Sequence, residues 1–514
     1  MKKSYIVVSL CIIFFLSLFI FEKINLTTAD IGRHIENGKL LVHGGEGISR
    51  SALLHTNFFS FTHPEFPFVN HHWGSGIIFY TIYIVLGFFG LSLLYSGLII
   101  ATVLILFYLF KDRLPLWVSI PTTLALIPLI ADRIEVRPEG FSYLFISSTI
   151  ALLYAYRQGH LNQRWLYAIP VISLFFVNMH IYFILMPCIV GAFLFETLAQ
   201  RDFKKSKHLV IALIASTLAL FINPYGPKGV LYPLTIFQNY GYLVVENQSI
   251  PFLVKYGIVN PNFFWWKLVT AFMLSLGFIL FIKHRKSFPV ALFGIALVFA
   301  VLSFSQIRHF ALYGIALMPF FLHGAYLLYK PPISKESKEN HIIASTITTI
   351  LLIIIILIHF SPNLPWSRDW GFGLKSDVNS SIEFFKKENL RGPIFSNYDI
   401  GGYLIFHTYP KEKIFVDNRP EAYPAEFFEK VYKPIQENSE TWKEELEKQN
   451  FNVIYFYRHD LTPWAQKFLI SRIEDPDWAP VFVDNYTIIF VKRNPENAAI
   501  IKAYELPKSM FIVK

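Results

Sequence analysis

The sequence has little charge and almost no cysteine, and both shortages exclude classes of protein. Only 16% of its 514 residues are Asp, Glu, Lys or Arg, whereas a soluble globular protein usually carries about 25%. The two cysteines, Cys11 and Cys188, lie in apolar runs, which leaves no disulfide framework and no thiolate metal site. The net charge of +10 comes without a stripe of basic and aromatic residues, so we expect no nucleic-acid partner.

Long hydrophobic runs occupy most of the chain before residue 360, and they predict a polytopic α-helical membrane protein. A bilayer crossing takes about 20 apolar residues. We expect about eleven transmembrane helices, near residues 5–21, 91–110, 114–130, 139–156, 165–178, 181–199, 208–222, 264–282, 288–304, 310–329 and 342–360. The apolar segment 76–90 is interpreted as a helix in the outer interface, because Gly87 and Gly90 join it to the next span.

The distribution of basic residues predicts the orientation of these helices. Cytoplasmic loops of membrane proteins collect Lys and Arg, and every predicted inner loop is basic if the N-terminus lies inside. We therefore expect a multi-pass protein of the cytoplasmic membrane with a cytoplasmic N-terminus. The C-terminal residues would then lie in the periplasm or outside the cell. The short outer loops carry few charges, apart from Arg133, Arg137 and Arg308.

The composition changes after Phe360, which predicts two domains. Residues 1–360 would form the transmembrane domain, including a long outer loop at 22–75, and residues 361–514 would form a soluble α/β domain. The pattern predicts strands at 394–396, 413–416 and 452–457, a closing hairpin at 478–484 and 486–491, and helices at 380–388 and 440–448.

The first outer loop is rich in polar and aromatic residues, and it holds the candidate catalytic residue. Asp30 follows the first predicted helix closely, and its carboxylate could act as a general base on an acceptor hydroxyl or amine. In the alternative, Asp30 caps the helical turn at 31–36. Further candidate binding residues in this loop are Arg33, His34, His71 and His72.

The outer arginines form a second candidate group. A guanidinium binds phosphate oxygens through paired hydrogen bonds, so Arg133, Arg137 and Arg308 would suit a phosphate headgroup. The alternatives are local pairing with the acidic residues at 132, 135 and 139, or ordinary contact with membrane lipid.

Polar residues at the outer ends of predicted helices add two candidate binding residues, His180 and Glu246. Ionisable groups at such depth usually face a cavity rather than lipid. The outer histidines have no fixed ligand spacing, so we assign no metal ligand, and capping or interhelical hydrogen bonds are their expected roles.

Several short motifs resemble a bacterial subgroup of uncharacterised membrane proteins that are similar to GT-C glycosyltransferases. They are Asp30-Ile-Gly-Arg-His, Asn70-His-His-Trp-Gly, Arg137-Pro-Glu, Asn178-Met-His, Asn223-Pro-Tyr-Gly, Gly401-Gly402-Tyr403 and Asp417-Asn-Arg419. The architecture also resembles the GT-C family, with one helix, a long outer loop carrying an early acidic residue, many further spans and an outer C-terminal domain. That family includes protein O-mannosyltransferases, oligosaccharyltransferases and the lipid A aminoarabinose transferase.

The resemblance implies a glycosyltransferase that uses a sugar on a polyprenyl phosphate or pyrophosphate. The acceptor at the outer face, which could be a glycan, a lipid or a protein, is not identified. Asp30 would be the catalytic carboxylate, and one or more of the outer arginines would hold the lipid-linked phosphate. Many members carry adjacent acidic residues in this loop, whereas Ile31 and Gly32 follow Asp30 here, so a divalent metal cofactor stays open.

Two other classes of function compete with this interpretation. One is a transporter or flippase for a lipid-linked glycan, and the other is a non-catalytic envelope assembly protein. Transporters tend to show internal repeats and broken, charged helices at mid-membrane. The sequence shows no convincing repeat, and its polar residues gather at outer helix ends, which favours a reaction at the outer face.

Single cysteines test the predicted orientation. Introduced at positions 45, 240 and 430, they should react with a membrane-impermeant maleimide from outside, because the basic loops are held inside. Cysteines at 205 and 335 should react only after the membrane is permeabilised. Opposite labelling at 45 and 430 would contradict the orientation.

Overall fold

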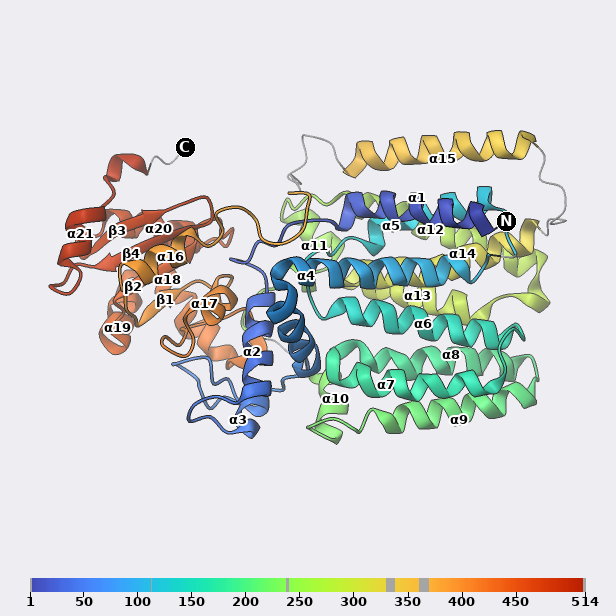
Figure 1. Ribbon diagram of the computed structural model, residues 1–514, viewed down its shortest axis with the longest axis horizontal. Helices are drawn as coiled ribbons and strands as arrows, with labels where there is room; N and C mark the ends of the chain where they lie inside the picture. Colours follow the sequence, from blue (N-terminus) through green and yellow to red (C-terminus); the bar gives the residue numbers. More distant parts are fainter. Residues whose placement is uncertain (1, 112, 237–239, 330–337, 360–368, 512–514) are drawn as a thin grey trace. The chain divides into compact units, whose positions relative to one another are not determined.

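The computed structural model describes residues 2–111, 113–236, 240–329, 338–359 and 369–511 (Figure 1). Contacts divide the chain into two compact units. The first, called the helical unit, comprises Met1–Glu22, Ser92–Val230 and Val244–Phe372. The second, called the mixed unit, comprises Lys23–Leu91, Leu231–Leu243 and Gly373–Lys514. The start of the predicted C-terminal domain, at 361–368, lies outside the described residues.

Long apolar helices that run side by side build the helical unit (Figure 1). They are α1 (Lys2–Ile20), the second part of α4 (Trp73–Tyr108), α5 (Leu116–Ile130), α6 (Glu139–Arg157), α7 (Ala168–Met179), α8 (Leu185–Ala199), α9 (Phe203–Ala219), α12 (Pro261–Lys283), α13 (Val290–Ser305), α14 (Phe310–Tyr329) and α15 (Lys338–His359). Helix α14 is buried on almost every face from Phe310 to Gly324 and packs against α5, α12 and α13. A helix that is apolar all round lies either in a protein core or in a membrane, and most of α14 lies in the core of the helical unit.

Four helices in the described part of the chain are long and apolar enough to cross a membrane. They are Trp73–Tyr108, Ile181–Ala199, Pro261–Lys283 and Ile307–Tyr329. Shorter apolar helices lie at Tyr5–Ile20, Leu116–Ile130, Val290–Ser305 and Thr348–Leu357. These segments fit a multi-pass membrane protein, and the total of about eleven spans stays a prediction.

Helix α4 breaks at Gly87, near the junction that the sequence predicted between the segment 76–90 and the next span. Gly87 has φ 60° and ψ −157°, a conformation that glycine adopts readily because it has no Cβ atom. The break separates residues 73–86 from residues 88–108. The position of the first part in the membrane interface stays a prediction.

The mixed unit contains a four-stranded sheet with the strand order β1-β2-β4-β3 (Figure 1). Its strands are β1 (Ile394–Ser396), β2 (Val453–Tyr457), β3 (Trp478–Val483) and β4 (Thr487–Lys492). Strands β1 and β2 are parallel, while β4 pairs antiparallel with both β2 and β3. The predicted strands at 394–396 and 452–457 and the predicted hairpin are therefore confirmed.

Short helices complete the mixed unit. They are α2 (Ile31–His43), α3 (Arg50–His55), α10 (Pro227–Thr235, which the unit boundary divides), α16 (Ser380–Lys387), α17 (Gly401–Thr408), α18 (Pro434–Glu437), α19 (Ser439–Gln449), α20 (Ala465–Glu474) and α21 (Ala498–Tyr504). The predicted helices at 380–388 and 440–448 correspond to α16 and α19. The predicted strand at 413–416 is wrong, because Ile414 makes only an isolated bridge to Ser60 in the first outer loop.

Helix α2 packs with unusually close backbone contacts inside the mixed unit. A Cβ atom on Gly38 would lie 2.0 Å from the carbonyl oxygen of Gly76. A Cβ atom on Gly32 would lie 2.9 Å from the carbonyl oxygen of Gly402. Only glycine permits such an approach, so α2 is held between the first part of α4 and helix α17.

Substituting Gly38 by Ala tests this packing. The added methyl group would overlap the Gly76 carbonyl, so we expect a loss of stability of about 1–3 kcal/mol. Gly97→Ala on the same helix as Gly76 is the matched control, because a Cβ atom there meets nothing within 4 Å. Thermal unfolding in detergent should show a lower Tm for Gly38→Ala and an unchanged or higher Tm for Gly97→Ala. Equal Tm values for the two variants would contradict the close approach.

Candidate active site

Asp30 lies at the start of α2, and its carboxylate is held by a residue distant in the sequence. Asp30 occupies the N-cap position, yet in the described part of the chain its side chain makes no capping hydrogen bond. The alternative of a capping carboxylate is therefore not supported. Instead, the Asn418 side-chain amide donates a hydrogen bond to Asp30 Oδ1.

Arg33 lies one helical turn after Asp30 and contacts the same asparagine. Its Nε donates to Asn418 Oδ1 at 3.3 Å, and the side chain is buried. Burial lowers the pKa of the Arg33 guanidinium, and the nearby Asp30 carboxylate opposes this effect. The candidate base and a predicted binding residue therefore belong to one polar cluster.

Asp417 and Arg419 fix the backbone on both sides of Asn418. Arg419 donates to both carboxylate oxygens of Asp417, at 2.8 and 2.6 Å. The same guanidinium donates to Asn57 Oδ1 at 2.7 Å and lies 4.7 Å from the centre of the Phe68 ring. Burial alone would lower the pKa of Arg419, but the Asp417 carboxylate raises it, which keeps the guanidinium charged.

Glu421 adds a second carboxylate to this part of the mixed unit. It is half-buried, and burial raises the pKa of its carboxyl group against the opposing effect of Arg33 and Arg419. Sequence reasoning assigned no role to Asn418 or Glu421. The sequence feature that could have identified them is the motif Asp417-Asn-Arg419, which contains Asn418 and is followed closely by Glu421.

The three predicted binding histidines of the first outer loop lie together. The rings of His34 and His72 are 5.1 Å apart, edge to face, and those of His71 and His72 are 3.7 Å apart. The His71 ring also lies 5.5 Å from that of Tyr232. Within the described residues, no group of three or more His, Cys, Asp or Glu side chains could hold a metal ion. The described side chains therefore do not form a ligand set for a divalent metal.

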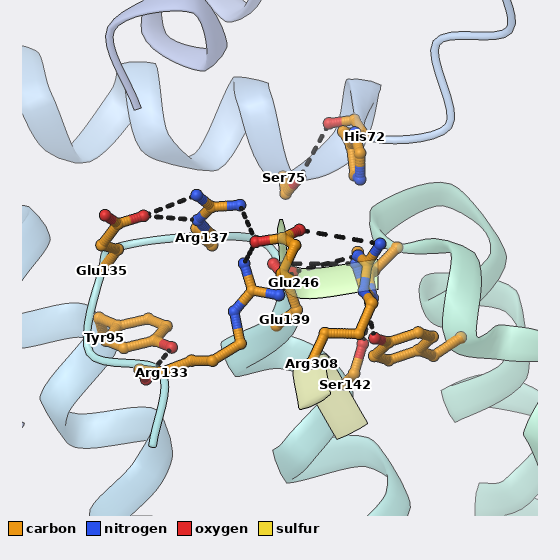
Figure 2. A network of polar contacts seen from close by, with 12 residues as sticks. His72, Ser75, Tyr95, Arg133, Glu135, Arg137, Glu139, Ser142, Glu246 and Arg308 are labelled. Carbon is orange, nitrogen blue, oxygen red and sulfur yellow. Dashed lines mark hydrogen bonds and ion pairs between the residues drawn. The ribbon is translucent and has the colours of Figure 1, made fainter. Parts of the chain in front are cut away.

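The three predicted arginines of the helical unit meet at one carboxylate (Figure 2). Glu246 lies in the short helix η3 (Val245–Asn247). Its carboxylate is 2.7 Å from Arg133 Nη2, 3.5 Å from Arg137 Nη1 and 3.8 Å from Arg308 Nη1. Sequence reasoning selected all four of these residues, and the structure brings them together.

Further polar residues surround this arginine cluster. Glu139, the first residue of α6, lies 3.5 Å from both Arg133 and Arg308, and Glu135 lies 2.7 Å from Arg137. His180 Nε2 is 3.8 Å from Glu139, so this predicted residue joins the same network. The expected pairing with Glu135 and Glu139 is present, and Asp132 accepts a hydrogen bond from the side chain of Asn262 at 2.7 Å.

Electrostatics keep the central carboxylate ionised. Burial alone would raise the pKa of Glu246, but Arg133, Arg137 and Arg308 outweigh it and lower the pKa to about 2. Burial likewise would lower the pKa of Arg133, and the Glu246 carboxylate raises it above the ordinary value. Three guanidinium groups around one carboxylate form a geometry that suits an oxyanion with several oxygens, such as a phosphate.

Known proteins were compared with the chain by sequence and by structure. No family model matches the sequence, and no curated protein matches it. Among solved structures, it is similar to the oligosaccharyltransferase AglB from Archaeoglobus fulgidus in complex with an inhibitory peptide and a dolichol-phosphate. That match has 12% identity and a TM-score of 0.55 over 94% of this chain and 74% of AglB. The same enzyme in complex with Zn and sulfate matches with 11% identity and a TM-score of 0.55, over 94% and 73%.

A third similar structure is ArnT from Cupriavidus metallidurans bound to undecaprenyl phosphate. It matches with 14% identity and a TM-score of 0.50, over 97% of this chain and 98% of ArnT. Both enzymes belong to the GT-C superfamily. The resemblance to this superfamily is therefore confirmed at the level of the fold.

Replacing Glu246 by Gln tests the electrostatic role of the central carboxylate. The substitution removes a negative charge from beside three guanidinium groups, so we expect the free energy of unfolding to fall by about 2 kcal/mol. This is less than the roughly 3–5 kcal/mol for a fully buried pair, because the Glu246 side chain is 26% exposed. Glu135→Gln is the control and should cost no more than about 0.5 kcal/mol, because that side chain is 46% exposed.

The pH dependence of the stability difference between wild type and Glu246→Gln gives a second measurement. The ordinary pKa of the glutamate carboxyl is 4.5, and in the folded protein it falls to about 2. A lowered pKa stabilises the fold above the unfolded value and ceases to do so as the pH falls through the folded value. The Tm difference between wild type and Glu246→Gln should therefore be constant above pH 4.5 and shrink towards about 2. A difference that does not depend on pH across this range would contradict the ion pairs.

Proposed function

We propose that the protein is a membrane glycosyltransferase that moves a sugar from a polyprenyl-phosphate or pyrophosphate donor to an acceptor at the outer face of the cytoplasmic membrane. The observation that carries the proposal is the meeting of three guanidinium groups on Glu246 in a chain with the fold of ArnT. The ArnT structure contains undecaprenyl phosphate, and an AglB structure contains a dolichol-phosphate. Both of these similar structures therefore hold a polyprenyl phosphate, the kind of lipid that the proposed donor carries.

In this proposal the arginine cluster binds the donor phosphate. The phosphate oxygens would replace the Glu246 carboxylate on Arg133, Arg137 and Arg308, since both groups accept hydrogen bonds from guanidinium donors. As the bond between the anomeric carbon and the phosphate oxygen breaks, its electron pair stays on the departing polyprenyl phosphate. The guanidinium groups would stabilise the negative charge that develops there.

Asp30 would act as the general base. The acceptor hydroxyl or amine attacks the anomeric carbon from the side opposite the leaving phosphate, which inverts the configuration. Its proton passes to the Asp30 carboxylate, so one bond forms to the sugar as one bond breaks to the phosphate. The neighbouring Arg33 and Asn418 support an ionised carboxylate, because cations and hydrogen-bond donors favour that form.

Purified protein and a set of polyprenyl-phosphate sugars test this function. Asp30→Asn should lower kcat by about 100-fold or more, while donor affinity stays within about twofold, because the amide keeps the shape but accepts no proton at neutral pH. Glu36→Gln is the matched control, since Glu36 is a buried carboxylate of the same helix that pairs with Lys39 at 3.0 Å. It should retain turnover.

Arg308→Gln tests whether the arginine cluster binds the donor phosphate. Loss of one guanidinium should weaken donor binding by about tenfold or more, with the loss seen in the Kd as well as in kcat/KM. Donor binding without turnover in the wild type, across hydroxyl and amine acceptors, would instead favour a flippase or a binding protein. Full activity of Asp30→Asn would exclude Asp30 as the base.

A further inference from the structure

Asn418 connects the candidate base to a cation through the two ends of one amide. Its nitrogen donates to Asp30 Oδ1, and its oxygen accepts from Arg33 Nε at 3.3 Å. A carboxylate can only accept and a guanidinium can only donate. The two partners therefore define which way the amide points, because a flipped amide would place like groups against each other at both ends.

The backbone that carries Asn418 is anchored on both sides. Asp417 and Arg419 form a buried ion pair at 2.6 Å, and the Arg419 backbone N–H also donates to Asp417 Oδ1 at 2.9 Å. Arg419 further binds Asn57 of the first outer loop. A side chain on such a segment has little freedom, as residues that orient a reacting group require.

Two glycines allow this segment to come close to Asp30. A Cβ atom on Gly401 would lie 2.4 Å from the Asp417 Cα. A Cβ atom on Gly402 would lie 3.3 Å from Asn418 Nδ2 and 3.4 Å from the carbonyl oxygen of Ala29. The backbone at Gly401 and Gly402 therefore leaves room for Asn418 next to the residue that precedes Asp30.

We propose that Asn418 is a positioning residue that orients the Asp30 carboxylate for proton transfer, so that the segment 417–421 completes the active site. This inference rests on the proposed role of Asp30 as base. The amide on Oδ1 favours one rotamer of the Asp30 carboxylate. In this inference the C-terminal part of the chain contributes to the reaction through Asn418.

Other charged and titratable groups share this electrostatic environment, and two of them, Arg33 and Tyr398, interact directly with Asp30. The groups are Arg33 of α2 and, from the C-terminal segments, Tyr398, Asp399, Asp417, Arg419 and Glu421. The test therefore changes Asn418 alone and leaves these groups in place.

The pH dependence of turnover tests the positioning role. In Asn418→Ala, the carboxylate loses a donor that favours its ionised form, so the acidic limb of the kcat profile should move to a pH about one higher. In Asn418→Asp, a second negative charge stands beside Asp30, and the limb should move further in the same direction. We expect kcat to fall about tenfold or more, with the KM for donor within about twofold.

Asn397→Ala is the structural control. Asn397 is a buried asparagine of the same unit that binds Asp460 and the backbone of Tyr457. Its loss should lower the Tm and the yield of active enzyme without moving the acidic limb. An unmoved limb in Asn418→Ala, or an equal shift in Asn397→Ala, would overturn the positioning role.

Thermal unfolding separates failure of this inference from failure of the proposed function. A double-mutant cycle of Asp30→Asn and Asn418→Ala should be non-additive, because the two side chains are in contact. Additive Tm changes would overturn the contact, whatever the activity. The cycle could be non-additive while the wild type turns over no lipid-linked sugar. That result would refute both the glycosyltransferase proposal and the positioning role of Asn418.

Discussion

An ionised group beside apolar helices must be neutralised by its neighbours, and this constraint shapes the arginine cluster. Removing a charge from water is expensive unless a partner of opposite sign lies close. Arg133, Arg137 and Arg308 therefore gather around the carboxylates of Glu139 and Glu246. Under the proposed function, an anionic ligand would bind there by taking over this neutralising role, which would favour ligands with several negatively charged oxygens.

The mixed unit depends instead on glycine residues, because their lack of a Cβ atom lets backbone segments approach closely. Gly32 and Gly38 face the backbone of other segments from one helix, so the start of α2 is held where the Asn418 amide reaches Asp30.

Local patterns in the sequence predicted much of the fold. Apolar runs with turn residues on either side identified β1, β2 and the β3–β4 hairpin, and amphipathic spacing identified α16 and α19. The segment 413–416 has the same local pattern, but its partner is Ser60, more than 350 residues away. Composition cannot show such a pairing, so the strand prediction failed.

The residues of the candidate site likewise include some that local sequence patterns predicted and some that only the structure revealed. Charges that oppose the expected topology revealed Arg133, Arg137 and Arg308, and Glu135 and Glu139 were expected partners because they lie nearby in the sequence. Glu246 was selected only as a polar residue at an outer helix end, and its position between the arginines became visible in the structure. Asn418 escaped selection because its partner Asp30 is 388 residues away in the sequence.

That separation has a consequence for biosynthesis. Translation produces Asp30 early, but its amide partner Asn418 emerges only after most of the chain has been made. A nascent or truncated chain would therefore carry the Asp30 carboxylate without the Asn418 amide.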